Sequence, residues 1–380
     1  MKTLPDNPDL DQLRRQAKDL LAGLRDIRPR TTLAEAQASL AEQYGFRTWT
    51  DLKAEVDRLQ GGAEVADPAL ARQIAARFGL GEVTGEMRSV SRPDEVGRRW
   101  LVPTVRGRWS ARTVDDVYPV TDGEENARFQ ESAARAGVLL PAPVRSIEGA
   151  VVEEIGGSRW RVYEWLRTGP PLAAPVSATV TRAVGATLAT IHGMRFPADR
   201  LCYWSSNRLS PRSWPETADL AAAKGADWAP VLRAALPTLL GLEAIGGEPG
   251  DPVLCHNNLN PGNVRVGAAG RLVVTGWEHA AGLPPAWELC SALVNWTVTP
   301  GGGVNARGAR ALVEGYGTLP QLDLQAFRGT ATALQNYVSG QVDLALDEPT
   351  GFAERNVRHL LTHLPSQATF EEILAVVQRT

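Results

Sequence analysis

The stretch that decides the fold of this chain is CHNNLNPGNV, residues 255–264. It follows the apolar residues 252–254, and a turn at residues 267–270 separates it from a second apolar run, residues 272–274. That run leads into TGWEH, residues 275–279. The alternation predicts a strand hairpin that brings two polar loops to one edge, which is a common way to build a site on a rigid support.

The two loops resemble the catalytic loop and the metal-binding loop of the aminoglycoside phosphotransferase family, small-molecule kinases that share the protein-kinase fold. In that family the first loop reads His-x-Asp-x-x-x-x-Asn and the second reads approximately Ile-Asp-Trp-Glu. Here His256 and Asn263 match the ends of the first loop, and Asn258 replaces its Asp. In the second loop Gly276 replaces the metal-binding Asp, and Glu278 matches the Glu. The frame of the site is present, but two of its three chemical residues are replaced.

These replacements remove charge from the site that the resemblance implies. Phosphoryl transfer needs bound metal ions, a neutralised γ-phosphate and a base near the acceptor hydroxyl. The amide of Asn258 is not a base near neutral pH, and Gly276 has no side-chain ligand. Asn263 remains as the metal candidate, whereas Mg²⁺ is normally bound through carboxylates together with substrate phosphates. No Asp lies between Asp251 and Asp323, so misalignment does not hide the missing acids.

The nucleotide side of the site is altered as well. Arg112, in the segment GRWSART, stands where the resemblance puts the phosphate-binding Lys, and Glu131 stands where a helix supplies its ion-pair partner. None of the four lysines of the chain lies in this region, and an Arg is not equivalent to a Lys at such a position. The turn matching the glycine-rich loop contains a single glycine, Gly97.

Three side chains near Asn258 are candidate acid–base groups: His256, Glu278 and His279. The resemblance implies that His256 supports the loop backbone, and His279 is also interpretable as an ordinary loop histidine. Glu278 and His279 together remain candidates for proton transfer in a different reaction.

Substrate contacts are expected from the segment that follows residue 200. Trp204, Trp214 and Trp228 lie where the family's substrate-binding helices begin, which suggests an aromatic-lined pocket, with burial in the core as the alternative.

The expected fold class is α+β: a two-lobed kinase-like domain preceded by a three-helix module. Asp9 is a predicted N-cap, and Thr32 with Glu35 forms a predicted capping box. The module contains YGFxxWxxLK and resembles a short helical unit found in bacterial proteins, for which a structural or docking role, including a protein partner, is expected. The predicted boundaries are 1–60 for the module, 61–67 for a linker, 68–166 for the N-lobe and 167–380 for the helical C-lobe.

Composition narrows the class of protein. A formal net charge of −3 over 380 residues gives no reason to expect a nucleic-acid partner. The chain has no run of eighteen apolar residues and no signal-peptide pattern, so neither a membrane span nor secretion is expected. Three cysteines far apart favour reduced thiols and a cytoplasmic location.

Three functions follow as hypotheses. The first is a pseudokinase that binds a small molecule in the cleft and acts by binding or regulation. The second is a repurposed enzyme that performs non-phosphoryl chemistry on a small molecule. The third is an active ATP-dependent O-phosphotransferase with unorthodox metal ligands. ATP and Mg²⁺ are cofactors by resemblance alone. Because Asn258 and Gly276 lie in predicted polar loops, replacing both with Asp is expected to be tolerated at a cost of about 1 kcal/mol.

Overall fold

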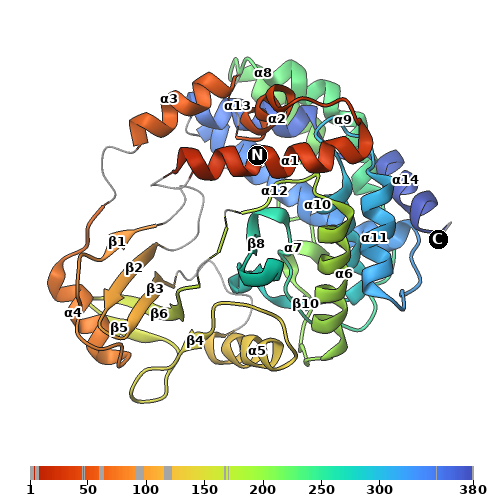
Figure 1. Cartoon of the computed structure of the whole chain (residues 1–380). Helices are drawn as coiled ribbons and strands as arrows, with labels where there is room; N and C mark the ends of the chain where they lie inside the picture. Colours follow the sequence, from red (N-terminus) through yellow and green to blue (C-terminus); the bar gives the residue numbers. More distant parts are fainter. Residues whose placement is uncertain are drawn as a thin grey trace.

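A computed structural model of the chain describes residues 4, 8–44, 46, 48–59, 64–90, 98–114, 122–166, 168–169, 171–347 and 349–378 (Figure 1). The turn matched to the glycine-rich loop, residues 91–97, lies outside these residues, as does part of the predicted linker.

Residues 10–59 contain the three expected helices: α1 (Leu10–Ile27), α2 (Leu33–Gln43) and α3 (Trp49–Leu59). Asp9 caps α1 by accepting a hydrogen bond from the backbone N–H of Asp11 at 2.7 Å. Thr32 and Glu35 form the predicted capping box at the start of α2. The apolar stripes of these helices meet in a buried cluster that includes Leu13, Leu20, Leu40, Leu52 and Val56.

The N-lobe is an antiparallel sheet with two helices. Its strands follow the order β1-β2-β3-β6-β4, and β5 pairs with β6. The elements are α4 (Pro68–Arg77), β1 (Arg88–Ser89), β2 (Arg99–Thr104), β3 (Gly107–Thr113), α5 (Gly123–Arg135), β4 (Pro143–Val144), β5 (Glu153–Ile155) and β6 (Ser158–Glu164).

Part of the predicted linker belongs to this sheet. The N–H of Ser89 donates to the carbonyl of Glu64 at 2.8 Å, and the N–H of Ala66 donates to that of Met87 at 2.9 Å. Residues 64–66 therefore extend the sheet edge beside β1, because their backbone groups find partners there.

The C-lobe is mainly helical and contains two short antiparallel strand pairs. The predicted strand at residues 272–274 is β9 (Leu272–Val274), which pairs with β8 (Val264–Val266). The apolar run before the first loop is β7 (Val253–Cys255), which pairs with β10 (Ala281–Leu283). The two polar loops thus lie between two small sheets. The helices are α6 (Ala178–Gly193), α7 (Tyr203–Ser206), α8 (Trp214–Ala223), α9 (Ala229–Glu243), α10 (Pro285–Thr297), α11 (Ala306–Tyr316), α12 (Arg328–Asp347), α13 (Gly351–Thr362) and α14 (Gln367–Val377).

The module is docked on the C-lobe, where Arg307 of α11 pairs with Asp26 of α1, and it lies across from the N-lobe strands (Figure 1). Ala173 is part of the module's apolar cluster, and the side chain of Gln43 donates to the carbonyl of Ala174 at 3.1 Å. The backbone of α1 at Gly23 lies so close to Pro175 that a Cβ added to Gly23 would lie 2.2 Å from the carbonyl oxygen of Pro175. The linker therefore is not the module's sole attachment.

None of the helices in the described part of the chain has the length and apolar character needed to cross a lipid bilayer. Cys202, Cys255 and Cys290 are buried free thiols.

Candidate functional site

A cavity of about 1240 Å³, here called the cleft, lies between the lobes. Its walls include the end of β6 and the hinge after it, residues 163–166, and both polar loops of the C-lobe. The module forms a further wall, to which Asp9, Gln12, Gln16, Gln43 and Tyr44 contribute. No local sequence signal marks these module residues, because they reach the cleft only through long-range docking.

Hydrogen bonds to buried side chains fix the backbone of the first loop. Asn257 has a left-handed backbone with φ of 61°, and its N–H donates to the buried carboxylate of Glu288. His256 is fully buried: its Nε2 donates to the carbonyl of Thr275 at 3.0 Å, and its Nδ1 accepts from the N–H of Asn258. Burial lowers the pKa of His256 to about 4, so the ring is neutral at pH 7. With both ring nitrogens occupied and no surface on the cleft, His256 supports the loop backbone.

The asparagines of the first loop are hydrogen-bonded to one another. Asn258 Oδ1 accepts from Asn260 Nδ2 at 2.6 Å, and the backbone carbonyl of Asn258 accepts from Asn263 Nδ2 at 2.9 Å. Gly276 has φ of +86°, and an added Cβ there would lie 2.7 Å from Asn263 Cγ. The expectation that an Asp at position 276 costs little is therefore wrong, because Asn263 occupies the space that the new side chain would enter.

Glu278 and Arg112 form an ion pair across the cleft, with 2.8 Å between Arg112 Nη1 and Glu278 Oε1. The Arg112 side chain is 12% exposed and the Glu278 side chain 23% exposed. Burial by itself raises the pKa of Glu278, but the Arg112 guanidinium and His279 outweigh that effect and hold this pKa well below its ordinary value. His279 Nε2 lies 3.8 Å from the same carboxylate. Glu278 is thus a carboxylate already neutralised by a cation of the protein.

The residues present do not fit Mg²⁺, which the family resemblance implies. Gly276 supplies no ligand, Asn263 offers only a neutral amide oxygen, and Glu278 faces a guanidinium at contact distance. A Mg²⁺ site usually combines one or two carboxylates with substrate phosphates. No carboxylate here is available without breaking the Arg112 pair.

Glu131 does not pair with Arg112. It accepts from Arg145 Nε at 3.1 Å instead. One residue earlier on α5, Gln130 is buried and lines the cleft, since a step of one residue turns a helix by about 100°. Gln130 in turn donates to Asn126 at 2.6 Å, and Asn126 donates to the carbonyl of Trp277 at 2.8 Å. Uncharged amides therefore join α5 to the second loop.

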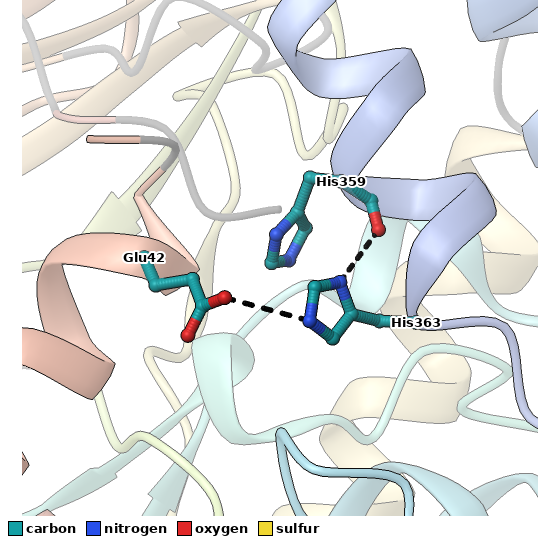
Figure 2. Close-up of side chains that lie close together, drawn as sticks. All are labelled: Glu42, His359 and His363. Carbon is teal, nitrogen blue, oxygen red and sulfur yellow. Dashed lines mark hydrogen bonds and ion pairs between the residues drawn. The ribbon is translucent and has the colours of Figure 1, made fainter. Parts of the chain in front are cut away.

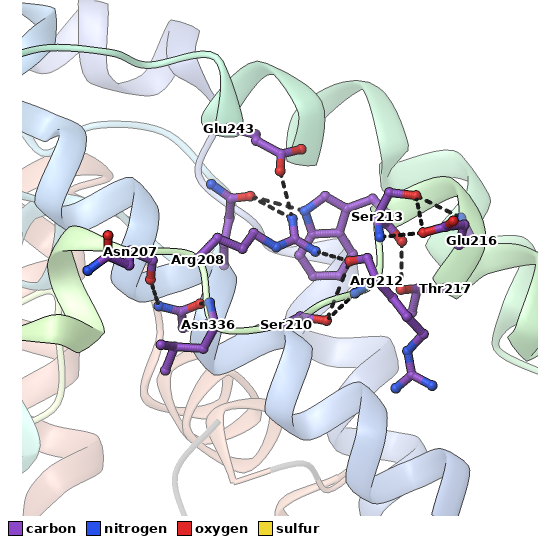
Figure 3. A network of polar contacts seen from close by, with 12 residues as sticks. Asn207, Arg208, Ser210, Arg212, Ser213, Glu216, Thr217, Glu243 and Asn336 are labelled. Atoms are coloured by element: carbon purple, nitrogen blue, oxygen red, sulfur yellow. Dashed lines mark hydrogen bonds and ion pairs between the residues drawn. The ribbon is translucent and has the colours of Figure 1, made fainter.

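Of the three tryptophans predicted to line a pocket, only Trp204 lines the cleft. Trp214 and Trp228 are fully buried in a second apolar core formed by α8, α9, α12 and α13. Trp214 donates to Gln335 at 3.0 Å, and the Arg208 guanidinium lies 4.3 Å from the centre of its ring. Figure 3 shows the polar network around Arg208, which also contacts Glu243 and the carbonyl of Arg212. The prediction of an aromatic pocket was wrong for Trp214 and Trp228, because these rings join helices to one another.

Comparison with known proteins identifies the architecture. The sequence profile of the phosphotransferase enzyme family matches residues 92–324, more than half of the chain. A solved structure of spectinomycin phosphotransferase with ADP and spectinomycin superposes with a TM-score of 0.58 at 13% identity, over 83% of this chain and 99% of that one. For the microcompartment-associated aminopropanol kinase the TM-score is 0.53 at 15% identity, covering 81% and 98%. Amicoumacin kinase with AMP-PNP and Ca²⁺ gives 0.52 at 13%, covering 82% and 94%.

These likenesses show the fold, and the predicted two-lobed kinase-like α+β class is confirmed. Among curated proteins, none matches the chain by sequence.

Proposed function

Because the chain belongs to the phosphotransferase enzyme family, we propose that it keeps the family's cleft as a small-molecule site and acts by binding or regulation, without Mg²⁺-dependent phosphoryl transfer. The ion pair between Arg112 and Glu278 carries this proposal. A guanidinium lies against the only carboxylate of the two polar loops, at the place where an active kinase needs a metal ion.

The number of missing catalytic groups supports a binding role. Phosphoryl transfer depends almost entirely on positioning and on stabilising charge in the transition state. Removing a single such stabilising group typically costs about 10²–10³ in rate. This chain lacks the acid at Asn258 and the acid at Gly276, and it has Arg112 in place of the Lys.

The lining of the cleft favours an uncharged ligand with several hydroxyl or amide groups. Five asparagines of the C-lobe line it: Asn257, Asn258, Asn260, Asn263 and Asn295. An amide side chain both donates and accepts hydrogen bonds and carries no charge, so such a wall matches polar, neutral groups.

A repurposed enzyme is the second candidate. It is supported by His279, whose side chain is 27% exposed, lines the cleft and lies 3.8 Å from Glu278. The third hypothesis, an active kinase, requires Glu278 to exchange Arg112 for a metal ion. Breaking a mostly buried charge pair is expensive, on the order of 3–5 kcal/mol when one partner is lost.

The test is calorimetric titration of ATP with and without Mg²⁺, on the wild type and on Glu278→Gln. Mg²⁺ is expected to leave ATP affinity unchanged in both proteins, because neither offers it a carboxylate. A large gain with Mg²⁺ in the wild type that disappears in Glu278→Gln would establish a metal site and refute the proposal. Phosphorylation of any member of a metabolite panel at ordinary kinase rates, roughly 1–100 per second, would refute it as well.

A further inference from the structure

Three side chains of types that can bind metal ions lie together where the module contacts the C-lobe, apart from the Arg112–Glu278 pair. Glu42 comes from α2, His359 from α13, and His363 caps the end of α13. One potential ligand atom from each lies within 4.8 Å of the other two. Figure 2 shows both imidazole rings close to the Glu42 carboxylate.

The spacing of the two histidines suits chelation. Residues four apart lie on one face of a helix, so His359 and His363 can bind one ion together. Their ring centres are 4.4 Å apart. His359 and His363 are partly buried, and all three residues line the cleft, so an ion can enter from it.

The hydrogen bonding of His363 leaves one nitrogen for a cation. Its Nδ1 lies 2.8 Å from the carbonyl of His359, which is an acceptor only, so Nδ1 carries the proton. In the neutral ring, Nε2 then presents a lone pair toward Glu42 Oε1 at 3.5 Å. Two lone pairs facing each other call for a proton or a metal ion between them. A second ring nitrogen bonded to a backbone carbonyl is also the usual arrangement of a metal-binding histidine.

The distance between these two atoms matches a shared metal ion. Zinc bonds of about 2.0–2.1 Å at tetrahedral angles place two ligand atoms roughly 3.3–3.4 Å apart. The observed 3.5 Å is close to that value, and it is long for a strong hydrogen bond. Two imidazoles with one carboxylate form a ligand set typical of zinc and its neighbours in the first transition row, since Mg²⁺ and Ca²⁺ prefer oxygen alone.

We propose that Glu42, His359 and His363 bind one divalent transition-metal ion of the zinc class, that this ion fastens the module to the C-lobe, and that its open coordination position faces the cleft. The proposal is independent of the absence of a Mg²⁺ site, because it uses other residues on another wall. A ligand in the cleft with a nitrogen or oxygen donor would complete the coordination.

A second cluster of potential ligands, His192, Cys255 and Glu288, is of a different kind. It is fully buried, and the Glu288 carboxylate is already bound by His192 Nε2 at 2.9 Å and by the N–H of Asn257. These groups satisfy one another, so this cluster supports the first loop.

The experiment is titration of chelator-treated full-length protein with Zn²⁺ by calorimetry, with Co²⁺ spectroscopy to report nitrogen and oxygen ligands. One ion per chain is expected. Loss of an outer partner of a metal ligand already weakens binding about 10–100-fold, so Glu42→Gln, His359→Gln and His363→Gln should each weaken it at least about 100-fold. Glu372→Gln on α14 and His279→Gln in the cleft are matched controls that should bind like the wild type.

Hydrogen exchange tests the fastening role. Zn²⁺ should slow exchange in α1 and α2 of the wild type and leave it unchanged in His363→Gln. Absence of stoichiometric binding in the wild type, or equal binding by the three variants and the controls, would overturn the site. Binding that survives Glu42→Gln but is lost in both histidine variants would overturn the bridge between module and C-lobe.

Discussion

At the scale of single residues, the Arg112–Glu278 pair makes stability depend on pH. The folded-state pKa of Glu278 lies below its unfolded value, so the pair stabilises the fold above about pH 4.5 and is lost as the pH falls through the folded pKa. In Arg112→Gln, Glu278 stays buried but loses the neighbouring guanidinium, so the pKa of Glu278 rises. The variant should lose about 3–5 kcal/mol at pH 7 and regain part of this deficit, relative to the wild type, near pH 4.

Denaturant unfolding at pH 7 and pH 4 measures this effect. The double variant Arg112→Gln/Glu278→Gln removes both charges and should recover most of the stability lost at pH 7. A deficit that is the same at both pH values would mean that the pair does not carry the charge coupling described for it.

The same scale shows where sequence reasoning reached its limit in the cleft. The loop residues His256, Asn258, Gly276 and Glu278 were identifiable because a loop of fixed length ties their positions together. The direction of the Glu131 side chain was not, because Glu131 and Gln130 differ only by a turn of the helix about its axis, and only packing sets that rotation.

At the scale of elements, two glycines distinguish the cost of backbone strain from the cost of crowding: Gly270 in the turn of the hairpin β8–β9 and Gly276 in the loop after it. Gly270 and Gly276 both have left-handed φ angles, of +72° and +86°. An added Cβ meets nothing within 4 Å at Gly270, but meets Asn263 at 2.7 Å at Gly276. Gly270→Ala should cost about 1–2 kcal/mol, the strain alone, and Gly276→Ala at least about 1 kcal/mol more, because Asn263 must leave its bond to Asn258.

Thermal unfolding of both variants checks the difference. Gly276→Asp should show the same crowding penalty, and this penalty should shrink in Asn263→Ala. Equal costs for Gly270→Ala and Gly276→Ala would indicate that Asn263 moves freely and that the second loop has room for an acid.

Local signals were enough to find most elements. Asp9 and the Thr32–Glu35 capping box mark helix starts through bonds between neighbours in the chain, so they were readable directly. Strand pairing was harder to predict from the sequence. β7 pairs with β10, which follows both loops in the chain, because the pairing of three-residue strands depends on how the surrounding core packs.

At the scale of the whole molecule, the close approach of α1 to residues 173–176 tests whether the module is part of the fold. Gly23 faces backbone atoms of Pro175, which cannot swing aside as a flexible side chain can. Gly23→Ala should lower stability by at least about 1–3 kcal/mol or release the module, although Ala is the better helix former. Gly340→Ala on α12, which meets nothing within 4 Å, should instead stabilise by up to about 1 kcal/mol.

Limited proteolysis with thermal unfolding distinguishes the two variants: cleavage between the module and the N-lobe should become faster in Gly23→Ala alone. Identical behaviour of Gly23→Ala and Gly340→Ala would mean that α1 does not press on Pro175 in solution. The docking was not predictable from sequence, because Gly23 and Pro175 carry no mark of their contact and are far apart in the chain.

The module wall of the cleft has a consequence for protein synthesis. Residues 9–44 form one side of the cleft, and His359 and His363, about 315 residues later, form another. A ribosome adding 5–20 residues per second needs roughly 15–60 s to join those two sides. During that interval the cleft that the module borders is incomplete. A ligand that contacts both sides can therefore bind only after residues 359–363 have been made.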